Sequence, residues 1–129
     1  MDYLREEHRV HLVAYRLVWC PKRRKRVLVG TIADGCERSI RAVCAERRWE
    51  VVRLAVRPDH VHLFVRASPS VAAHEIARAC KGRTSRVLRE RYRELLRLPS
   101  LWTRSYFCST VGNVSQQTVD HYIAAQVGR

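Results

Sequence analysis

The chain has 129 residues, enough for one hydrophobic core and too few for two ordinary domains, so we expect a single domain over residues 1–129. No run approaches the ~20 consecutive apolar residues of a membrane span, and residues 1–9 lack the apolar core of a signal peptide, so we expect a soluble cytoplasmic protein. The net charge of +13, carried mainly by arginine, favours a nucleic-acid partner over the blander explanation of solvated helix faces and a GC-rich genome.

The cysteines argue against a zinc ribbon and against a disulfide framework. Their number is odd, and no two of them form a CxxC pair. We therefore expect buried, reduced thiols at Cys20, Cys36, Cys44, Cys80 and Cys108.

The first half of the chain predicts a strand, a helix and two further strands. β-branched and aromatic residues predict a strand over residues 10–20, which Pro21 ends. Residues 31–48 have helical spacing, with a predicted buried stripe of Ile32, Cys36, Ile40, Val43 and Cys44. Residues 49–56 and 60–66 predict two strands, and the turn residues between them are typical of a hairpin.

The second half predicts a helix, a strand and a helix. Residues 68–70 are typical of a helix start with a serine cap, and the helix should reach about residue 98 with a break near Gly82. A strand over residues 101–111, a turn at 112–113 and a final helix from Ser115 to about residue 126 follow. Trp102 and Tyr106 could stack bases, but aromatic residues in a strand more often belong to a core, and we favour the core.

The order β-α-β-β-α-β-α predicts an α+β fold of the ferredoxin-like or RRM-like class. We expect an antiparallel sheet of about four strands with helices packed on one face, plus a C-terminal helix that carries Tyr122. The strand over residues 60–66 should be central, with one face free for a site.

Two histidines separated by one apolar residue are the most informative motif. Side chains of a strand alternate between faces, so His60 and His62 should point the same way and could share a divalent metal. The alternative is two histidines on a half-exposed strand face. A histidine-triad hydrolase would need a third histidine at the position of Phe64, and a two-histidine phosphodiesterase would need a second HxT or HxS motif, so both classes are excluded.

The last predicted helix carries two stripes. The polar stripe consists of Ser115, Thr118, Tyr122 and Gln126, and the apolar stripe of Val119, Ile123 and Val127. Tyr122 should therefore lie near an edge that faces the core, with the Gln126 amide oxygen one turn away. Two imidazoles and one amide oxygen around a metal would leave positions open for a phosphate oxygen and water. An ordinary amphipathic-helix tyrosine is the alternative.

Five segments, in this order and spacing, resemble the HUH endonucleases. Within that class the chain is similar to the single-tyrosine transposases of small bacterial or archaeal insertion sequences. The segments are LVWCPK at residues 17–22, RPDHVHLFV at 57–65, KGRTSR at 81–86, LWTRSYF at 101–107 and YIAAQ at 122–126.

The resemblance implies roles for single residues. His60, His62 and Gln126 would bind the metal, Mg²⁺ with Mn²⁺ as a substitute, and Tyr122 would be the nucleophile that forms a 5′-phosphotyrosine on single-stranded DNA. Asp59 would orient an imidazole as an outer partner or merely cap a turn, and both roles stay open. No nucleotide cofactor is implied. The implied partners are DNA hairpins at element ends and a second copy of the chain in a homodimer.

Basic residues would hold DNA phosphates. The predicted set is Lys22, Arg23, Arg24, Lys25, Arg26, Lys81, Arg83, Arg86 and Arg104. The chain departs from the family at Arg16, where relatives often have histidine, and at residues 22–24, where they usually read Lys-Tyr-Arg. Two alternatives remain: a non-catalytic or domesticated single-stranded nucleic-acid-binding module on the same fold, and a repeat-associated tyrosine transposase with the same chemistry.

Overall fold

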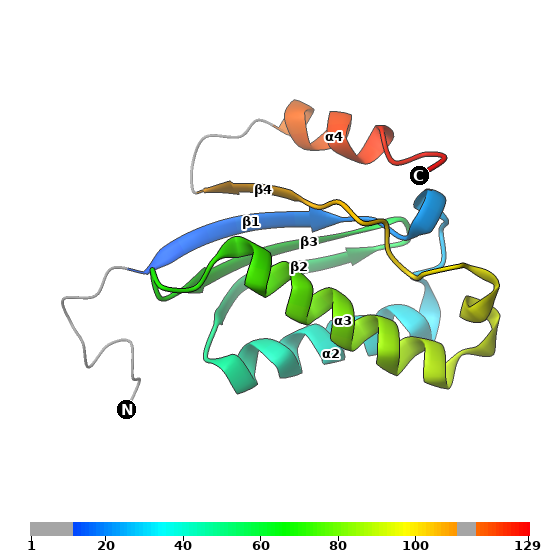
Figure 1. Ribbon diagram of the computed structural model, residues 1–129, viewed down its shortest axis with the longest axis horizontal. Helices are drawn as coiled ribbons and strands as arrows, with labels where there is room; N and C mark the ends of the chain where they lie inside the picture. Colours follow the sequence, from blue (N-terminus) through cyan, green and yellow to red (C-terminus); the bar gives the residue numbers. More distant parts are fainter. Residues whose placement is uncertain (1–11, 111–115) are drawn as a thin grey trace.

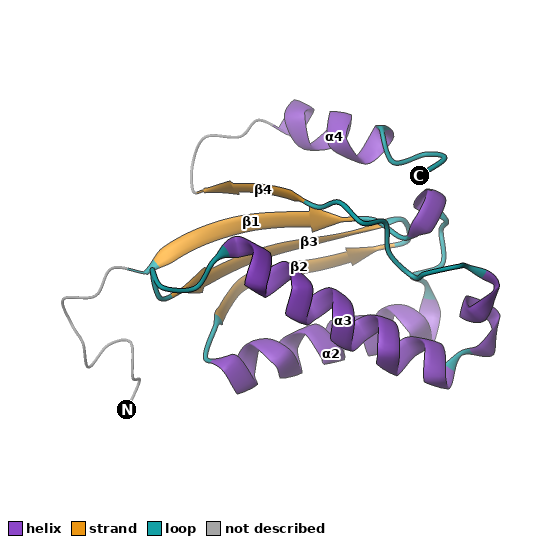
Figure 2. Ribbon diagram, in the orientation of Figure 1, coloured by secondary structure: helices purple, strands orange, loops and turns teal. Residues whose placement is uncertain are grey.

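The predicted order of elements is confirmed in a computed structural model, which describes residues 12–110 and 116–129. Four strands and three α-helices follow one another as expected, with two short 3-10 helices between them (Figures 1 and 2). The elements are β1 (Val13–Trp19), η1 (Lys22–Arg24), α2 (Gly30–Arg47), β2 (Glu50–Arg57), β3 (His60–Ala67), α3 (Ala73–Arg91), η2 (Arg93–Arg97), β4 (Phe107–Thr110) and α4 (Gln116–Ala124).

The four strands form one antiparallel sheet in the order β2-β3-β1-β4. β2 and β3 form the predicted hairpin, in which Arg57 pairs with His60. Because β3 lies between β2 and β1, the histidine strand is central, as predicted. Its His62 has Val18 of β1 on one side and Ala55 of β2 on the other.

Alternation along the strands divides the sheet into two faces. Leu17 and Trp19 of β1 join Leu63 of β3 in the main core, which α2 and α3 cover. The predicted stripe of α2 is buried there at every position, since its spacing keeps one side of the helix against the sheet. The opposite face carries His60 and His62, and α4 lies on that side (Figure 1).

A second, small cluster attaches α4 to the sheet. Val18 of β1 and Cys20, the residue that follows β1, pack against Val119 and Ile123 of α4. α4 therefore covers the β1 and β4 side of this face. Among the described residues, the β2 and β3 side carries the open surface that was expected for a site.

Three predicted details of α3 are wrong. The helix runs from Ala73 to Arg91 without a break at Gly82, because the buried stripe on either side of Gly82 holds both halves against the core. Its N-cap is Ala72 with no side-chain cap, while Ser68 and Ser70 bond to each other. After Arg91 the chain continues as the 3-10 helix η2 instead of reaching residue 98 as an α-helix.

The fourth strand is much shorter than predicted. Only Phe107–Thr110 pairs in the sheet, and of residues 101–106 only Trp102 forms an isolated bridge, with Pro21. Core packing decides this segment: the Trp102 ring lies edge-on to Trp19, with centroids 6.1 Å apart, and its Nε1 donates to Thr84 Oγ1 at 2.9 Å. The core assignment of Trp102 is confirmed.

The apolar stripe of the last helix was predicted correctly at two of three positions. Val119 and Ile123 are buried, but Val127 is 64% exposed because α4 ends at Ala124 and the chain turns there. The predicted turn at 112–113 and the Ser115 cap lie outside the described residues. All five cysteines are free and four are buried, as expected, but Cys108 is only half-buried. No helix among the described residues has the length and apolarity to cross a membrane.

Candidate active site

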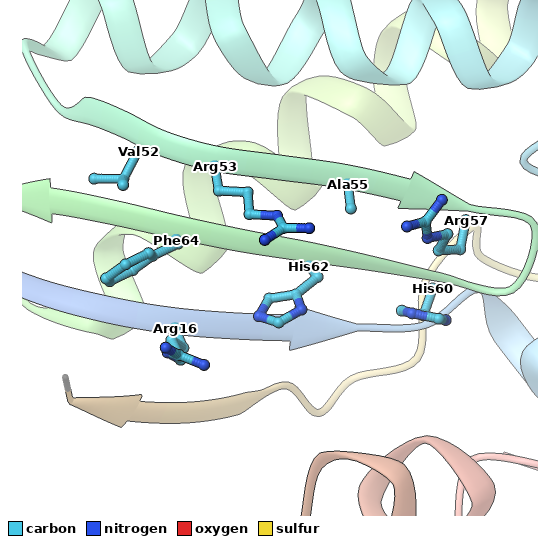
Figure 3. A pocket seen from close by; sticks show the side chains of 8 residues that line it. All are labelled: Arg16, Val52, Arg53, Ala55, Arg57, His60, His62 and Phe64. Atoms are coloured by element: carbon cyan, nitrogen blue, oxygen red, sulfur yellow. The ribbon is translucent and has the colours of Figure 1, made fainter. Parts of the chain in front are cut away.

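The two histidines of β3 lie side by side in a pocket on the open face of the sheet (Figure 3). Its volume is about 550 Å³. Strand pairing assembles it, because His60 faces Arg57 and His62 faces Ala55 on β2. The lining residues are Arg16, Val52, Arg53, Ala55, Arg57, His60, His62 and Phe64, which include three arginines and no carboxylate.

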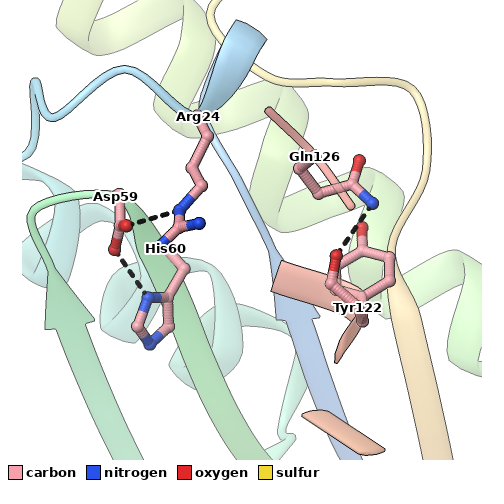
Figure 4. Close-up of polar contacts among 5 residues, drawn as sticks. All are labelled: Arg24, Asp59, His60, Tyr122 and Gln126. Atoms are coloured by element: carbon pink, nitrogen blue, oxygen red, sulfur yellow. Dashed lines mark hydrogen bonds and ion pairs between the residues drawn. The ribbon is translucent and has the colours of Figure 1, made fainter. Parts of the chain in front are cut away.

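A buried carboxylate holds His60 in place (Figure 4). Asp59 is 7% exposed, and its Oδ1 lies 2.9 Å from Nδ1 of His60 while its Oδ2 accepts from Nε of Arg24 at 2.7 Å. Burial raises the pKa of Asp59, but the hydrogen bonds from His60 and Arg24 outweigh it and hold the pKa below its usual range. Because a carboxylate only accepts, the His60 proton sits on Nδ1 and Nε2 stays available as a ligand.

Arg24, which donates to Asp59, lies in the short 3-10 helix η1. η1 follows β1, and within it Arg23 and Arg24 have φ values of 58° and 55°. Non-glycine residues rarely adopt this left-handed region. The ion pair with Asp59 therefore helps to stabilise the left-handed backbone conformation of Arg24, which is unfavourable for arginine.

His62 is tuned toward its neutral form. Burial lowers its pKa most, and the nearby charges of Arg16, His60 and Arg53 lower it further. Metal ions bind neutral imidazole, so this environment favours a ligand role over a permanent charge. The pair thus fits the nitrogen ligands of a divalent metal, although no group of three His, Cys, Asp or Glu side chains is close together within residues 12–110 and 116–129.

Tyr122 lies on α4 at the edge of the small cluster, as the helical spacing predicted. Its hydroxyl is 3.0 Å from Oγ of Ser105, and its ring packs at 5.9 Å from that of Phe107. Burial raises the pKa of Tyr122, and hydrogen bonds from Ser105 and Thr103 counter this only in part. The phenol is protonated at neutral pH and needs activation before it can attack.

Gln126 joins Tyr122, not the histidines. Its side chain is buried, with Oε1 accepting from Ser105 Oγ at 3.2 Å and Nε2 donating to the Tyr122 carbonyl at 3.1 Å. β1 runs between this cluster and His60 (Figure 4), and no hydrogen bond among the described residues joins the two. The amide oxygen predicted as a third metal ligand is thus turned toward Ser105.

Some of the basic residues predicted to bind phosphates form hydrogen bonds or ion pairs within the protein, and others are exposed to solvent. Lys81 donates to the carbonyls of Thr103, Arg104 and Ser105, at 2.8, 3.2 and 3.2 Å. Arg83 forms a bidentate pair with Glu46, and Arg24 donates a single hydrogen bond to Asp59. The exposed members are Arg23, Lys25, Arg26, Arg86 and Arg104, while Lys22 is half-buried.

Sequence reasoning did not place several neighbours of the site. Arg53 and Arg57 are an even number of residues apart on β2 and therefore lie on the same face. Once the hairpin with β3 was expected, this spacing could have placed them beside the histidines. Arg16 was noted only as a departure from relatives, whereas it lines the histidine pocket. Nothing in the local sequence marks Ser105 as the partner of Tyr122.

Comparison with known proteins identifies the family of this chain. The family model described as "Transposase IS200 like" matches residues 9–126. The ISDra2 transposase TnpA of Deinococcus radiodurans is 37% identical over 120 residues, covering 91% of this chain and 86% of that protein. The transposase of insertion sequence element IS200 from Salmonella typhimurium is 24% identical over 110 residues, covering 83% and 72%.

Solved structures agree. A crystal structure of a candidate transposase from Deinococcus radiodurans R1 has a TM-score of 0.85 at 31% identity, covering 93% of this chain and 95% of that one. A REP-associated tyrosine transposase bound to a REP hairpin shares the fold, with a TM-score of 0.58 at 16% identity and coverage of 88% and 63%. The chain belongs to the IS200-like transposase family.

Proposed function

We propose that this transposase cleaves and rejoins single-stranded DNA through Tyr122, assisted by a divalent metal bound at His60 and His62. The observation that carries the proposal is the histidine pair itself. Both imidazoles lie on one strand face, Asp59 fixes one of them with Nε2 free, and the other is held neutral. Such a pair is built to bind a metal ion, and the surrounding arginines suit a phosphate substrate.

The chemistry uses the chain's own residues as follows. The phenolate oxygen of Tyr122 attacks a phosphodiester, the P–O3′ bond breaks, and the DNA 5′ end stays on the enzyme as a phosphotyrosine. The phenol proton passes to solvent, and the leaving 3′ oxygen takes a proton from solvent. A 3′ hydroxyl attacking in reverse rejoins the strand, so no nucleotide cofactor is needed. Mg²⁺, or Mn²⁺ in its place, would neutralise charge on the phosphate and the leaving oxygen.

Gln126 would serve as third ligand after its side chain leaves Ser105. The Tyr122–Gln126 cluster and the histidine pair lie on opposite sides of β1 within one protomer. Either α4 moves across its own sheet, or α4 of a second copy completes the site in a homodimer. Mixing a His60→Ala protein with a Tyr122→Phe protein separates these arrangements, because activity returns only if the two halves come from different subunits.

Hairpin DNA at the ends of an insertion sequence is the proposed substrate. The hairpin bound by the REP-associated relative supports this choice, as does the net charge of +13. A repeat-associated housekeeping role would keep the same chemistry and differ only in which hairpin is cleaved. A panel of hairpins from both sources would therefore distinguish the two roles.

The deciding experiment is a covalent-adduct assay. Wild-type protein is incubated with labelled single-stranded hairpin DNA and Mg²⁺ or Mn²⁺, and adducts are resolved on a denaturing gel. Tyr122→Phe should abolish the adduct, whereas the matched control Tyr106→Phe, on another partly buried tyrosine, should retain it. An adduct that survives Tyr122→Phe would refute the mechanism. DNA binding without any adduct from the wild type would instead support a non-catalytic binding module.

A further inference from the structure

Two buried polar atoms without a hydrogen-bond partner belong to residues that pair across neighbouring strands, and one of these residues lines the histidine pocket. They are Nε of Arg16 and Oγ of Ser109, two of the four such side-chain atoms in the described part of the chain. Arg16 on β1 pairs directly with Ser109 on β4, so both side chains stand on the same face of the sheet. Burying an N–H or O–H without a partner costs stability, and such groups call for an explanation.

Arg16 is held in place by stacking on an aromatic ring, and no carboxylate of the described residues forms an ion pair with it. Its guanidinium lies over the ring of Phe64, 5.1 Å from the centroid, and Phe64 is also its cross-strand partner on β3 (Figure 3). Stacking fixes the plane of the guanidinium but leaves its N–H groups free to donate. The lining of the pocket includes no carboxylate that could pair with it.

The position of Arg16 relative to His62 is defined by strand register. His62 faces Val18, and Phe64 faces Arg16, so Arg16 lies one step of two residues further along the sheet. That step is roughly 7 Å along a strand. A nucleic-acid strand laid along this face would present one phosphate to the histidines and a neighbouring phosphate to Arg16.

We propose that Arg16, with Ser109 as a second donor, forms a binding subsite for a DNA backbone phosphate adjacent to the one at His60 and His62. The place of this subsite in a reaction rests on the proposed function. Its ligand chemistry does not, because the Arg16 guanidinium lines a pocket without carboxylates, the Ser109 hydroxyl stands on the neighbouring strand, and both donors suit any phosphodiester. The subsite would fix how the strand lies relative to the histidine pair.

The first test measures DNA binding without metal. Full-length protein is titrated into a fluorescent oligo-dT strand in EDTA, so that neither cleavage nor metal binding contributes. Arg16→Gln should weaken affinity about tenfold or more, and Ser109→Ala by a smaller factor. Arg16→Gln should also reduce the slope of log affinity against log salt by about 0.7, the value for one phosphate contact on a single strand.

The matched control is Arg66→Gln. Arg66 is on β3, on the face of the sheet that also carries Arg16, so the substitution removes one positive charge from that face. Arg66 lies 3.6 Å from Glu50 and does not line the pocket. The second test avoids substitution in the measured protein. It follows the Nε–H signal of Arg16 in the NMR spectrum of the wild type, which is assigned because Arg16→Gln lacks it. This signal should shift on addition of oligo-dT until the shift saturates.

Each outcome bears on the subsite separately from the cleavage chemistry. If Arg16→Gln binds within twofold of Arg66→Gln and the Arg16 signal does not move, the subsite is refuted, even if the wild type forms a Tyr122 adduct. If Arg16→Gln loses affinity while the wild type forms no adduct with metal, the subsite stands and the proposed function fails. Equal affinities of Ser109→Ala and wild type would remove Ser109 from the subsite.

Discussion

Replacing Asp59 with asparagine should weaken metal binding more than it weakens the fold. Asp59 accepts two hydrogen bonds, one from His60 and one from Arg24. Asparagine has one acceptor oxygen and presents an N–H where the second oxygen was. One of the two donors therefore loses its partner, and both lose the neighbouring negative charge.

The structure sets the size of each effect. A hydrogen bond to a charged group contributes about 1.5–3 kcal/mol. Because the Arg24 side chain is 32% exposed, solvent screens part of its share, and we expect the free energy of unfolding to fall by about 1.5–2 kcal/mol. Loss of the group that orients a metal-binding histidine typically costs 10–100-fold in metal affinity. His60 would then rotate freely and bind in fewer of its orientations.

Two measurements check this prediction. Mn²⁺ affinity comes from electron paramagnetic resonance of the free ion, and stability comes from urea unfolding of the same samples. Asp34→Asn, on the exposed side of α2, is the control for charge and should change neither. Reduced stability with Mn²⁺ affinity within twofold of wild type would refute the orienting role and leave Asp59 as a turn residue.

The pH dependence has a definite sign. Asp59 has its pKa held below the usual range in the folded state, so its contribution is fully present above the unfolded pKa of about 3.9. That contribution disappears as the pH falls through the folded value. The stability difference between wild type and Asp59→Asn should therefore narrow in acid below about pH 4.

Three further outcomes follow from the described contacts. Ser105→Ala removes a hydrogen bond that lowers the pKa of Tyr122, so adduct formation at pH 7 should slow about threefold to tenfold, and the two rates should converge only above about pH 10, where the phenol of the wild type is largely ionised; a loss that persists there would contradict this. Because burial and nearby arginines lower the pKa of His62, Mn²⁺ binding should persist below the ordinary histidine pKa of about 6.5, and a midpoint above it would contradict the assignment. Trp102→Phe deletes the bond to Thr84 and part of a buried ring, so urea unfolding should show a loss of about 1–2 kcal/mol, and no loss would contradict the core role.

Regular periodicity made much of this fold predictable. Alternation in β3 placed both histidines on one face, and spacing placed the buried stripe of α2. Local patterns failed where tertiary contacts override them. Residues 101–106 have the aromatic content of a strand, but Trp102 belongs to the main core and Lys81 holds the carbonyls that follow it.

The candidate site was predictable in its residues but not in its contacts. Tyr122 is on α4 and Gln126 follows two residues after α4 ends, so their proximity follows from a spacing of four residues. Arg24 and Asp59 are 35 positions apart, and Ser105 lies 17 positions before Tyr122. Such pairs depend on strand register and loop paths, which no short-range pattern encodes.

α4 contacts the sheet through a small cluster of buried side chains, so it should open independently of the rest of the domain. The main core lies on the far side of the sheet, and α4 contributes to none of it. An element secured by so few buried side chains opens at a lower free energy than the domain unfolds. Amide protons of α4 should therefore exchange through a separate, shallow opening while those of β1 and β3 exchange only on global unfolding. The tyrosine would then be carried on a subdomain that can detach and redock without disturbing the folded sheet that presents the histidines.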